Sequence, residues 1–151
     1  MSTVTDRLAE LGITVPTVTP AGAYVPAVRT GNLVFTAGQV PFVDGKLPAT
    51  GKVGAEISAE DAKGYARQSA INVLGAVAGI VDLNSVVRVV KVVGFVASAD
   101  GFTGQSGVIN GASELFAEVF GDAGKHARSA VGMAELPLGS PVEVEAVLEV
   151  R

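Results

Sequence analysis

Two long stretches of the chain carry apolar residues at the spacing of an α-helix. In the first, Ser58 is followed three positions later by Asp61, a variant capping box that predicts a helix beginning at this point. Its inward positions are Ala62, Tyr65, Ala66, Ser69, Ala70, Val73, Leu74 and Val77. A second helix is predicted from Ser106 to Phe120, ended by Gly121. Its inward positions are Ile109, Ala112, Leu115, Phe116 and Val119.

Other segments have the composition or the alternation of β-strands. Val86 to Ser98 is rich in β-branched residues, which lose side-chain freedom in a helix, so it predicts a long strand. The final segment, Val142 to Val150, alternates, with Val142, Val144, Ala146 and Leu148 on one face and Glu143, Glu145 and Glu149 near or on the other. Three more strands are predicted at Tyr24 to Arg29, Leu33 to Ala37 and Ser129 to Glu135. The first two form a hairpin, because Gly31 and Asn32 suit the turn between them.

The beginning of the chain predicts a helical extension over about residues 1–20. Thr3 or Thr5 can cap a short helix that ends near Gly12, and prolines mark the connector that follows. No repeat or linker divides the rest, so one domain over residues 1–151 is expected. The order of hairpin, helix, strand, helix and two strands predicts an α+β fold, a mixed sheet with two helices packed on one face.

Composition and charge narrow the chemistry. The chain has no cysteine and a single histidine, His126, so no metal site is expected. A net charge of −4 argues against general nucleic-acid binding, and a small anion would need a specific cation. The valine-rich run is interrupted by Arg88, Lys91 and Gly94 well short of the roughly 20 apolar residues of a membrane span. Because the N-terminus also lacks the pattern of a signal peptide, a cytoplasmic protein without membrane contact is expected.

Two segments resemble the RidA/YjgF family. They are YVPAVRTGNLVFTAGQVP in the predicted hairpin and INGASELFAEVFGDAGKHARSAVGMAELPLGSPVEVEAVLEV at the end of the chain. The second segment is the specific one, because it combines Arg-Ser-X-Val, a Leu-Pro pair and a Val-Glu-Val-Glu strand in register. The order of the elements between them matches as well, so the resemblance covers nearly the whole chain from Tyr24 onward.

The resemblance implies a chorismate-mutase-like fold and a homotrimer with three clefts between neighbouring subunits. It implies cofactor-independent hydrolysis of reactive enamines and imines to a 2-oxo acid and ammonia. By this analogy Arg128 holds the substrate carboxylate, since a guanidinium can make two charge-assisted hydrogen bonds. Glu143 falls at the family's position for a carboxylate that positions or activates water, and Tyr24 lines the pocket. The expected substrate-binding set is Arg128, Tyr24, Ala37, Gly38 and Ala130, with Glu143 as the catalytic residue.

The sequence also departs from the family pattern. Ala37 stands where many deaminating members carry serine, and Ala130 where many carry cysteine. A trimer that binds a small carboxylate without turnover is therefore an alternative, and a ribonuclease or translation inhibitor is a weaker one. His126 is interpreted as an exposed turn residue, and Asn110 as a residue at the inner side or rim of the second helix.

Overall fold

A computed structural model describes residues 2–151, and Met1 of the predicted domain lies outside the described residues. The helices are α1 (Val4–Glu10), α2 (Ala59–Ala78) and α3 (Gln105–Phe120), with short 3₁₀ turns η1 (Leu83–Ser85), η2 (Gly121–Gly124) and η3 (Pro137–Gly139). The strands are β1 (Ala27–Thr30), β2 (Leu33–Thr36), β3 (Val86–Ala97), β4 (Ala127–Met133) and β5 (Val142–Val150). Every predicted helix and strand is present, which confirms the α+β fold.

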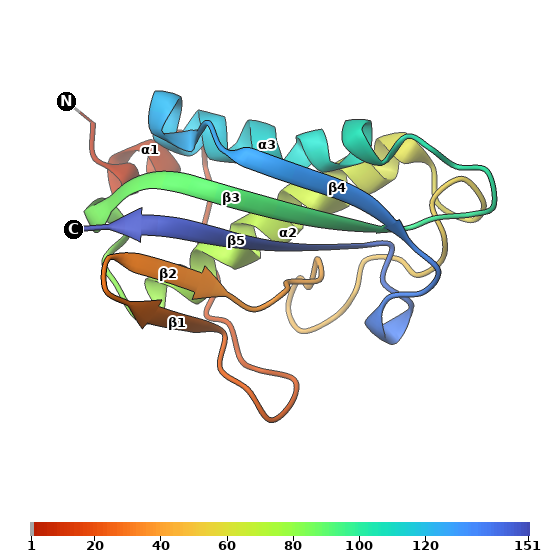
Figure 1. The fold of residues 1–151 in the computed structure, drawn as a ribbon, viewed down its shortest axis with the longest axis horizontal. Coiled ribbons are helices and arrows are strands. Elements are labelled where there is room, and N and C mark those ends of the chain that lie inside the picture. The colour runs from red at the N-terminus through yellow and green to blue at the C-terminus, as the bar shows by residue number, and fades with distance from the viewer. Residues whose placement is uncertain (1) are drawn as a thin grey trace.

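The five strands form one sheet in the order β1-β2-β5-β3-β4 (Figure 1). All neighbouring pairs are antiparallel except β3 and β4, which run parallel. The parallel pair is joined by α3, because parallel neighbours need a long crossover connection. The last strand of the chain thus lies in the centre of the sheet, and β4 lies at its edge.

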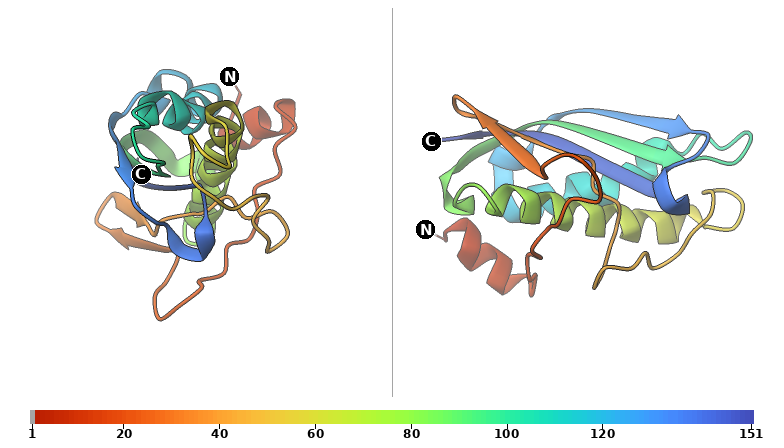
Figure 2. Two further views of the ribbon diagram at one scale, coloured as in Figure 1. Left: turned by 90° about the vertical axis from the view of Figure 1, so that its right-hand side faces the viewer. Right: turned by 90° about the horizontal axis from the view of Figure 1, so that it is seen from below.

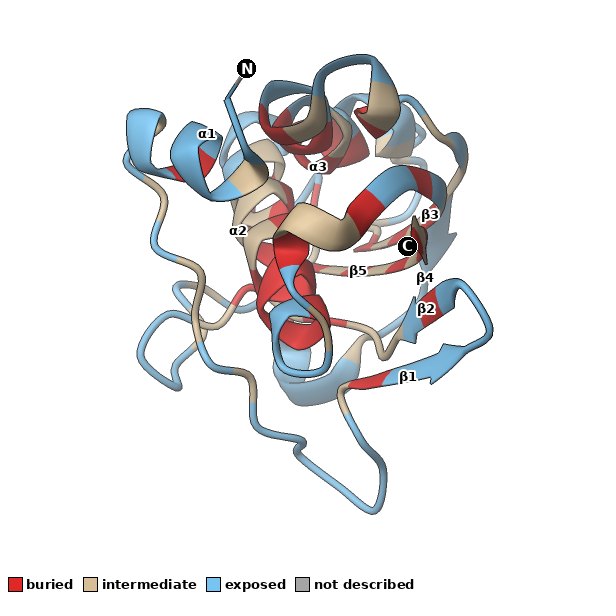
Figure 3. Cartoon of the chain, turned by 90° about the vertical axis from the view of Figure 1, so that its left-hand side faces the viewer, coloured by how far each residue is buried: buried red, intermediate tan, exposed pale blue. Residues whose placement is uncertain are grey.

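Helices α2 and α3 cover one face of the sheet, and in the described residues 2–151 no α-helix lies on the other face (Figure 2). The two helices approach each other closely at Gly111, where an added Cβ would overlap the backbone carbonyl of Lys63. A second close approach joins α3 to the sheet, since a Cβ on Gly94 would overlap the side chain of Ile109. The core therefore lies between this helical layer and the sheet, and Figure 3 shows the buried residues gathered there.

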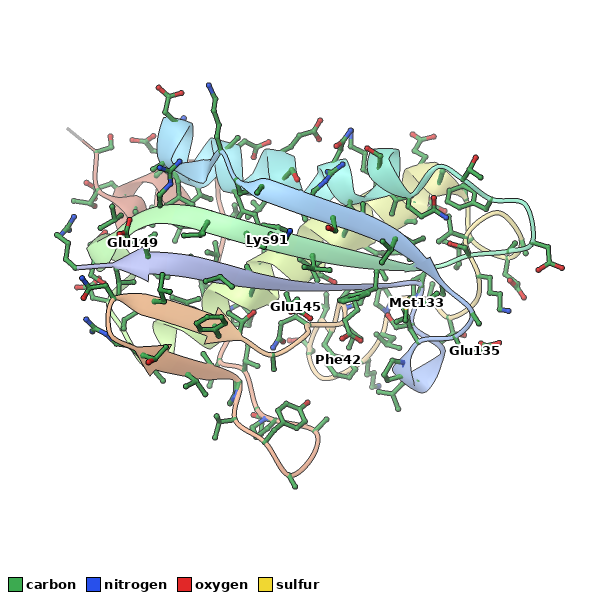
Figure 4. All side chains as sticks on the ribbon, in the orientation of Figure 1. Phe42, Lys91, Met133, Glu135, Glu145 and Glu149 are labelled. Carbon is green, nitrogen blue, oxygen red and sulfur yellow. The ribbon has the colours of Figure 1, made fainter. Side chains whose placement is uncertain are left out.

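Strand β5 shows the predicted alternation without exception. Val142, Val144, Ala146, Leu148 and Val150 are buried toward the helices, and the residues between them are partly exposed on the open face. Figure 4 shows Lys91, Glu145 and Met133 on this open face, with both long helices behind the sheet. Large apolar side chains also lie exposed there, including Phe35, Val131 and Met133.

Several element boundaries differ from the predictions. Tyr24 is not part of the first strand but lies in a bend three residues before β1, because Pro26 has no amide hydrogen to donate to a ladder. Strand β4 begins at Ala127, two residues earlier than predicted, since it pairs with β3 from Lys91 onward. The helical part of the N-terminal extension is confined to Val4–Glu10. None of the helices in residues 2–151 is long and apolar enough to cross a membrane.

Candidate functional site

A cavity of about 820 Å³ opens between the N-terminal connector and the segment that follows β2. Most of its walls come from two chain segments, residues 16–26 and 37–45. The cavity brings together four of the six predicted site residues, Tyr24, Ala37, Gly38 and Glu143. Most of the remaining lining is apolar, and no lysine or arginine of residues 2–151 contributes to it.

Asn72 on α2 holds one wall of this cavity. Its side-chain amide donates to the backbone carbonyls of Val40 at 3.0 Å and Phe42 at 3.1 Å, and its oxygen accepts from Gln68 at 3.1 Å. Asn72 is buried, so these bonds satisfy a polar group that would otherwise be costly inside the fold. Our sequence reasoning missed this residue. In the sequence, the only indication of this role is an amide side chain that lies between apolar neighbours in a helix otherwise rich in apolar positions.

Glu143 projects from β5 at the inner end of the cavity, against the backbone of Gly38. A Cβ at position 38 would overlap the carboxylate, so any larger residue there would displace the Glu143 side chain from this position. The segment that follows Gly38 is held beside β5 by two backbone hydrogen bonds between Gln39 and Val144, at 2.8 and 3.0 Å. Burial raises the pKa of the Glu143 carboxyl above its usual value, and the nearby Glu145 carboxylate raises it further. Glu143 is therefore suited to accepting a proton and returning it.

Tyr24 lines the outer part of the cavity and remains about half exposed. Its hydroxyl oxygen accepts a hydrogen bond from the Ala21 amide at 3.2 Å, which closes the bend in which it lies. The hydroxyl hydrogen has no protein acceptor within residues 2–151 and can be donated to a ligand. The structure places Tyr24 in the wall of the cavity, and its role toward a ligand stays a prediction.

Arg128 lies outside the cavity, on the edge strand β4. Its Nη1 donates to Asn110 Oδ1 at 2.9 Å and Ser113 Oγ at 3.1 Å, and its Nη2 donates to Ser106 Oγ at 2.8 Å and the Ser106 carbonyl at 3.3 Å. All four acceptors are neutral and belong to α3. No carboxylate of the described residues pairs with Arg128, so its positive charge is not compensated by the protein.

Ala130 follows the same face of β4 as Arg128. It pairs with Gly94 of β3 and packs against the core on the helical side. Glu143 instead pairs with Phe95 on the open side of the sheet. Within one chain, Arg128 and Ala130 are therefore separated from Glu143 by the sheet itself, and the six predicted residues do not form a single site.

His126 corrects a prediction, because the imidazole is half-buried rather than exposed. Its Nε2 lies 2.9 Å from Ser113 Oγ and its Nδ1 lies 2.6 Å from the Gly124 carbonyl oxygen. The ring also meets Phe116 edge to face, with centroids 5.9 Å apart. The sequence placed His126 in a turn, and only the packing of α3 against the start of β4 buries it.

Fold and site together define a YjgF-like α+β protein with a cavity that contains a carboxylate. The sequence model of the family described as Endoribonuclease L-PSP matches residues 15–150. The chain therefore belongs to this family, the RidA/YjgF family that its sequence resembles.

Relatives and solved structures agree with this assignment. The chain is 43% identical to Protein TCP17 of Trypanosoma cruzi, over 98% of this chain and 94% of that protein. It is 35% identical to the 2-iminobutanoate/2-iminopropanoate deaminase of Escherichia coli, over 83% of this chain and 86% of that protein. The crystal structure of Atu1372 from Agrobacterium tumefaciens, a protein with unknown function, superposes with a TM-score of 0.89 at 44% identity. That match covers 99% of this chain and 94% of the other.

Proposed function

We propose that this protein hydrolyses reactive enamines and imines of small carboxylic acids to a 2-oxo acid and ammonia, without a cofactor. The observation that carries the proposal is the Glu143 carboxyl, half-buried in the cavity with a raised pKa and packed on Gly38. The relative named as an iminobutanoate deaminase supports the reaction class. The enzyme is a hydrolase acting on a carbon–nitrogen double bond.

The reaction needs one water molecule and balanced proton transfers. Water attacks the imine carbon of the protonated substrate, and Glu143 accepts a proton from that water as the carbon–oxygen bond forms. Glu143 then passes this proton to the nitrogen, the carbon–nitrogen bond breaks with its electron pair leaving on ammonia, and the hydroxyl proton passes to the ammonia as the O–H electrons form the carbonyl. The products are the 2-oxo acid and ammonium, and no electron leaves or enters the system.

A second chain completes the proposed site. Among residues 2–151, no cationic side chain lines the cavity around Glu143, whereas Arg128 presents an uncompensated charge on the other side of the sheet. We propose that Arg128 of a neighbouring subunit holds the substrate carboxylate at a cleft between chains, in a cytoplasmic homotrimer. The exposed apolar side chains on the open sheet face, among them Phe35 and Val131, support burial of this face between subunits.

Ala37 and Ala130 favour a second candidate function, binding of a small carboxylate without turnover. Neither methyl group can donate a hydrogen bond, so Ala37 brings no hydroxyl to the cavity and Ala130 brings no thiol to β4. A carboxylate that raises the melting temperature while its imine precursor is not hydrolysed would favour this alternative over the enzyme.

The test is a coupled assay in which a dehydratase generates 2-aminoacrylate from serine and pyruvate release is followed. We expect the wild type to accelerate release, and Arg128→Ala and Glu143→Gln to abolish most of the acceleration. Glu149→Gln is the matched control, because Glu149 lies on the same strand and face but outside the cavity. Equal activity in all four proteins would contradict the proposed roles. No acceleration by the wild type, with this substrate or with 2-iminobutanoate, would contradict the enzyme.

A further inference from the structure

A chain of hydrogen bonds runs from the backbone of η2 to Arg128. It passes from the Gly124 carbonyl to His126, from His126 to Ser113, and from Ser113 to Arg128. The two ends of this chain are chemically unambiguous, since a carbonyl oxygen only accepts and a guanidinium only donates. The direction of every bond between them follows from these two ends.

The Gly124 carbonyl requires the hydrogen of the imidazole to be on Nδ1. In the neutral ring Nε2 then carries a lone pair and accepts the hydrogen of the Ser113 hydroxyl. With its hydrogen engaged, Ser113 Oγ offers its lone pairs to Nη1 of Arg128. His126 and Ser113 are thus each a donor on one side and an acceptor on the other.

The α3 partners of Arg128 lie on one face of the helix. Ser106, Asn110 and Ser113 are spaced by four and three residues, which places them in a row under the guanidinium. The Nε–H of Arg128 has no protein acceptor in the part of the chain that the structure describes. The hydroxyl hydrogen of Ser106 and the side-chain NH₂ of Asn110 also have no acceptor there. These donors together suit the oxygens of a carboxylate.

We propose that His126, acting through Ser113, is a positioning residue that holds the Arg128 guanidinium ready for a carboxylate. The inference rests on the proposed role of Arg128 as the carboxylate anchor. Arginine has a long, freely rotating side chain, and a bond that fixes one rotamer before binding reduces the entropy lost on binding. His126 itself does not touch the substrate, so its loss changes binding rather than the chemical step.

Two variants break this series of hydrogen bonds, and a third keeps an acceptor for Ser113. His126→Leu removes the acceptor for Ser113, and Ser113→Ala removes the link to Arg128 while leaving the imidazole against Phe116. His126→Gln places an amide oxygen near the position of Nε2 and can accept from Ser113. We expect KM for 2-iminobutanoate to rise roughly three- to tenfold in the first two variants, the size expected for one hydrogen bond, with kcat within about twofold of wild type. His126→Gln is expected to return KM close to the wild-type value.

Binding of 2-oxobutanoate, measured by calorimetry, separates this inference from the proposed reaction. If the wild type binds 2-oxobutanoate but hydrolyses no imine, the proposed reaction fails. The positioning role is then tested by Kd for 2-oxobutanoate, which we expect to rise in His126→Leu and Ser113→Ala and to return close to the wild-type value in His126→Gln. Unchanged KM and Kd in both His126→Leu and Ser113→Ala would overturn it. A wild type that neither binds nor turns over would overturn both proposals. If His126→Leu does not fold, as judged by circular dichroism, Ser113→Ala alone carries the test.

Nitrogen NMR of the imidazole gives a readout that needs no ligand. We expect the neutral ring of wild-type His126 to carry its hydrogen on Nδ1, with the coupling pattern of that tautomer retained in Arg128→Ala. A ring that carries its hydrogen on Nε2 would overturn the proposed direction of the hydrogen bonds, because Ser113 could then not donate to it.

Discussion

Glu143 and Arg128 project from opposite faces of the same five-stranded sheet. Glu143 on β5 lies on the open face, and Arg128 on β4 reaches toward α3 on the helical face. Strand β3 lies between them, so the two strands are about 10 Å apart within the sheet. A substrate that needs both side chains must therefore contact two copies of the chain.

Mixing two inactive variants should restore activity if the site is shared between chains. In a co-expressed mixture of Arg128→Ala and Glu143→Gln, a cleft formed by Glu143 of the first variant and Arg128 of the second contains both wild-type side chains. Random assembly of a cyclic trimer gives roughly a quarter of all clefts this composition. We expect about that fraction of wild-type kcat from the whole co-expressed mixture, measured against each variant expressed alone. Mixed trimers as inactive as the pure variants would show that the site does not combine these residues across chains.

Substituting Gly38 should disturb Glu143 through a direct steric conflict. A Cβ at position 38 would lie 2.8 Å from Cδ of Glu143, so Gly38→Ala forces the side chain to move. We expect a loss of about 1–3 kcal/mol in the free energy of unfolding, measured by urea denaturation. The same substitution in a Glu143→Ala background should cost much less, because the obstructing carboxylate is gone. An equal cost in both backgrounds would mean that the backbone, and not Glu143, requires the glycine.

Glu143 should make stability depend on pH. Because burial raises its pKa, the folded protein retains a proton that the unfolded chain releases, so its contribution favours folding at low pH and is lost as pH rises through the raised pKa. Glu143→Gln removes the cost of the buried charge, and we expect its melting temperature at pH 7 to exceed that of the wild type by about 1–3 °C. This difference should disappear below about pH 4, where the wild-type carboxyl is protonated in both states. Glu149→Gln serves as the comparison, because Glu149 does not line the cavity. A difference that persists at low pH would exclude ionisation as its cause.

Loss of Asn72 should loosen one wall of the cavity. Asn72→Ala removes the donors to the carbonyls of Val40 and Phe42; the Val40 carbonyl still accepts from the Phe42 amide at 2.8 Å, whereas the Phe42 carbonyl loses its side-chain donor. We expect a loss of about 2–3 kcal/mol in unfolding free energy, and faster amide hydrogen exchange in residues 39–45 than elsewhere. Gln68→Ala is the control, since it removes only the bond that orients Asn72 and should cost about 1 kcal/mol or less. Similar exchange in Asn72→Ala and wild type would show that other contacts hold this segment.

Local pattern was sufficient for much of the fold. Helix α2 was predicted from Ser58 onward because its cap and its apolar spacing are local signals, and the structure places its first residue at Ala59. Strand β5 was predicted with the bounds that it has in the structure. Valine and leucine recur at every second position, and this spacing is typical of a strand that packs one face on a hydrophobic core. The family followed from the motif around Arg128, and the sequence model of the family confirmed it.

The tertiary structure alone decided how these elements combine into sites. Alternation alone would turn the more apolar side of β4, which carries Val131 and Met133, toward the core, but the structure leaves both exposed on the open face. Pairing with β3 sets that orientation and turns Arg128 toward α3, away from the cavity that contains Glu143. The contact between His126 and Ser113 likewise needs α3 packed beside the start of β4. The sequence by itself therefore determined the elements, the family and the candidate residues, whereas long-range pairing and packing determined which of those residues meet.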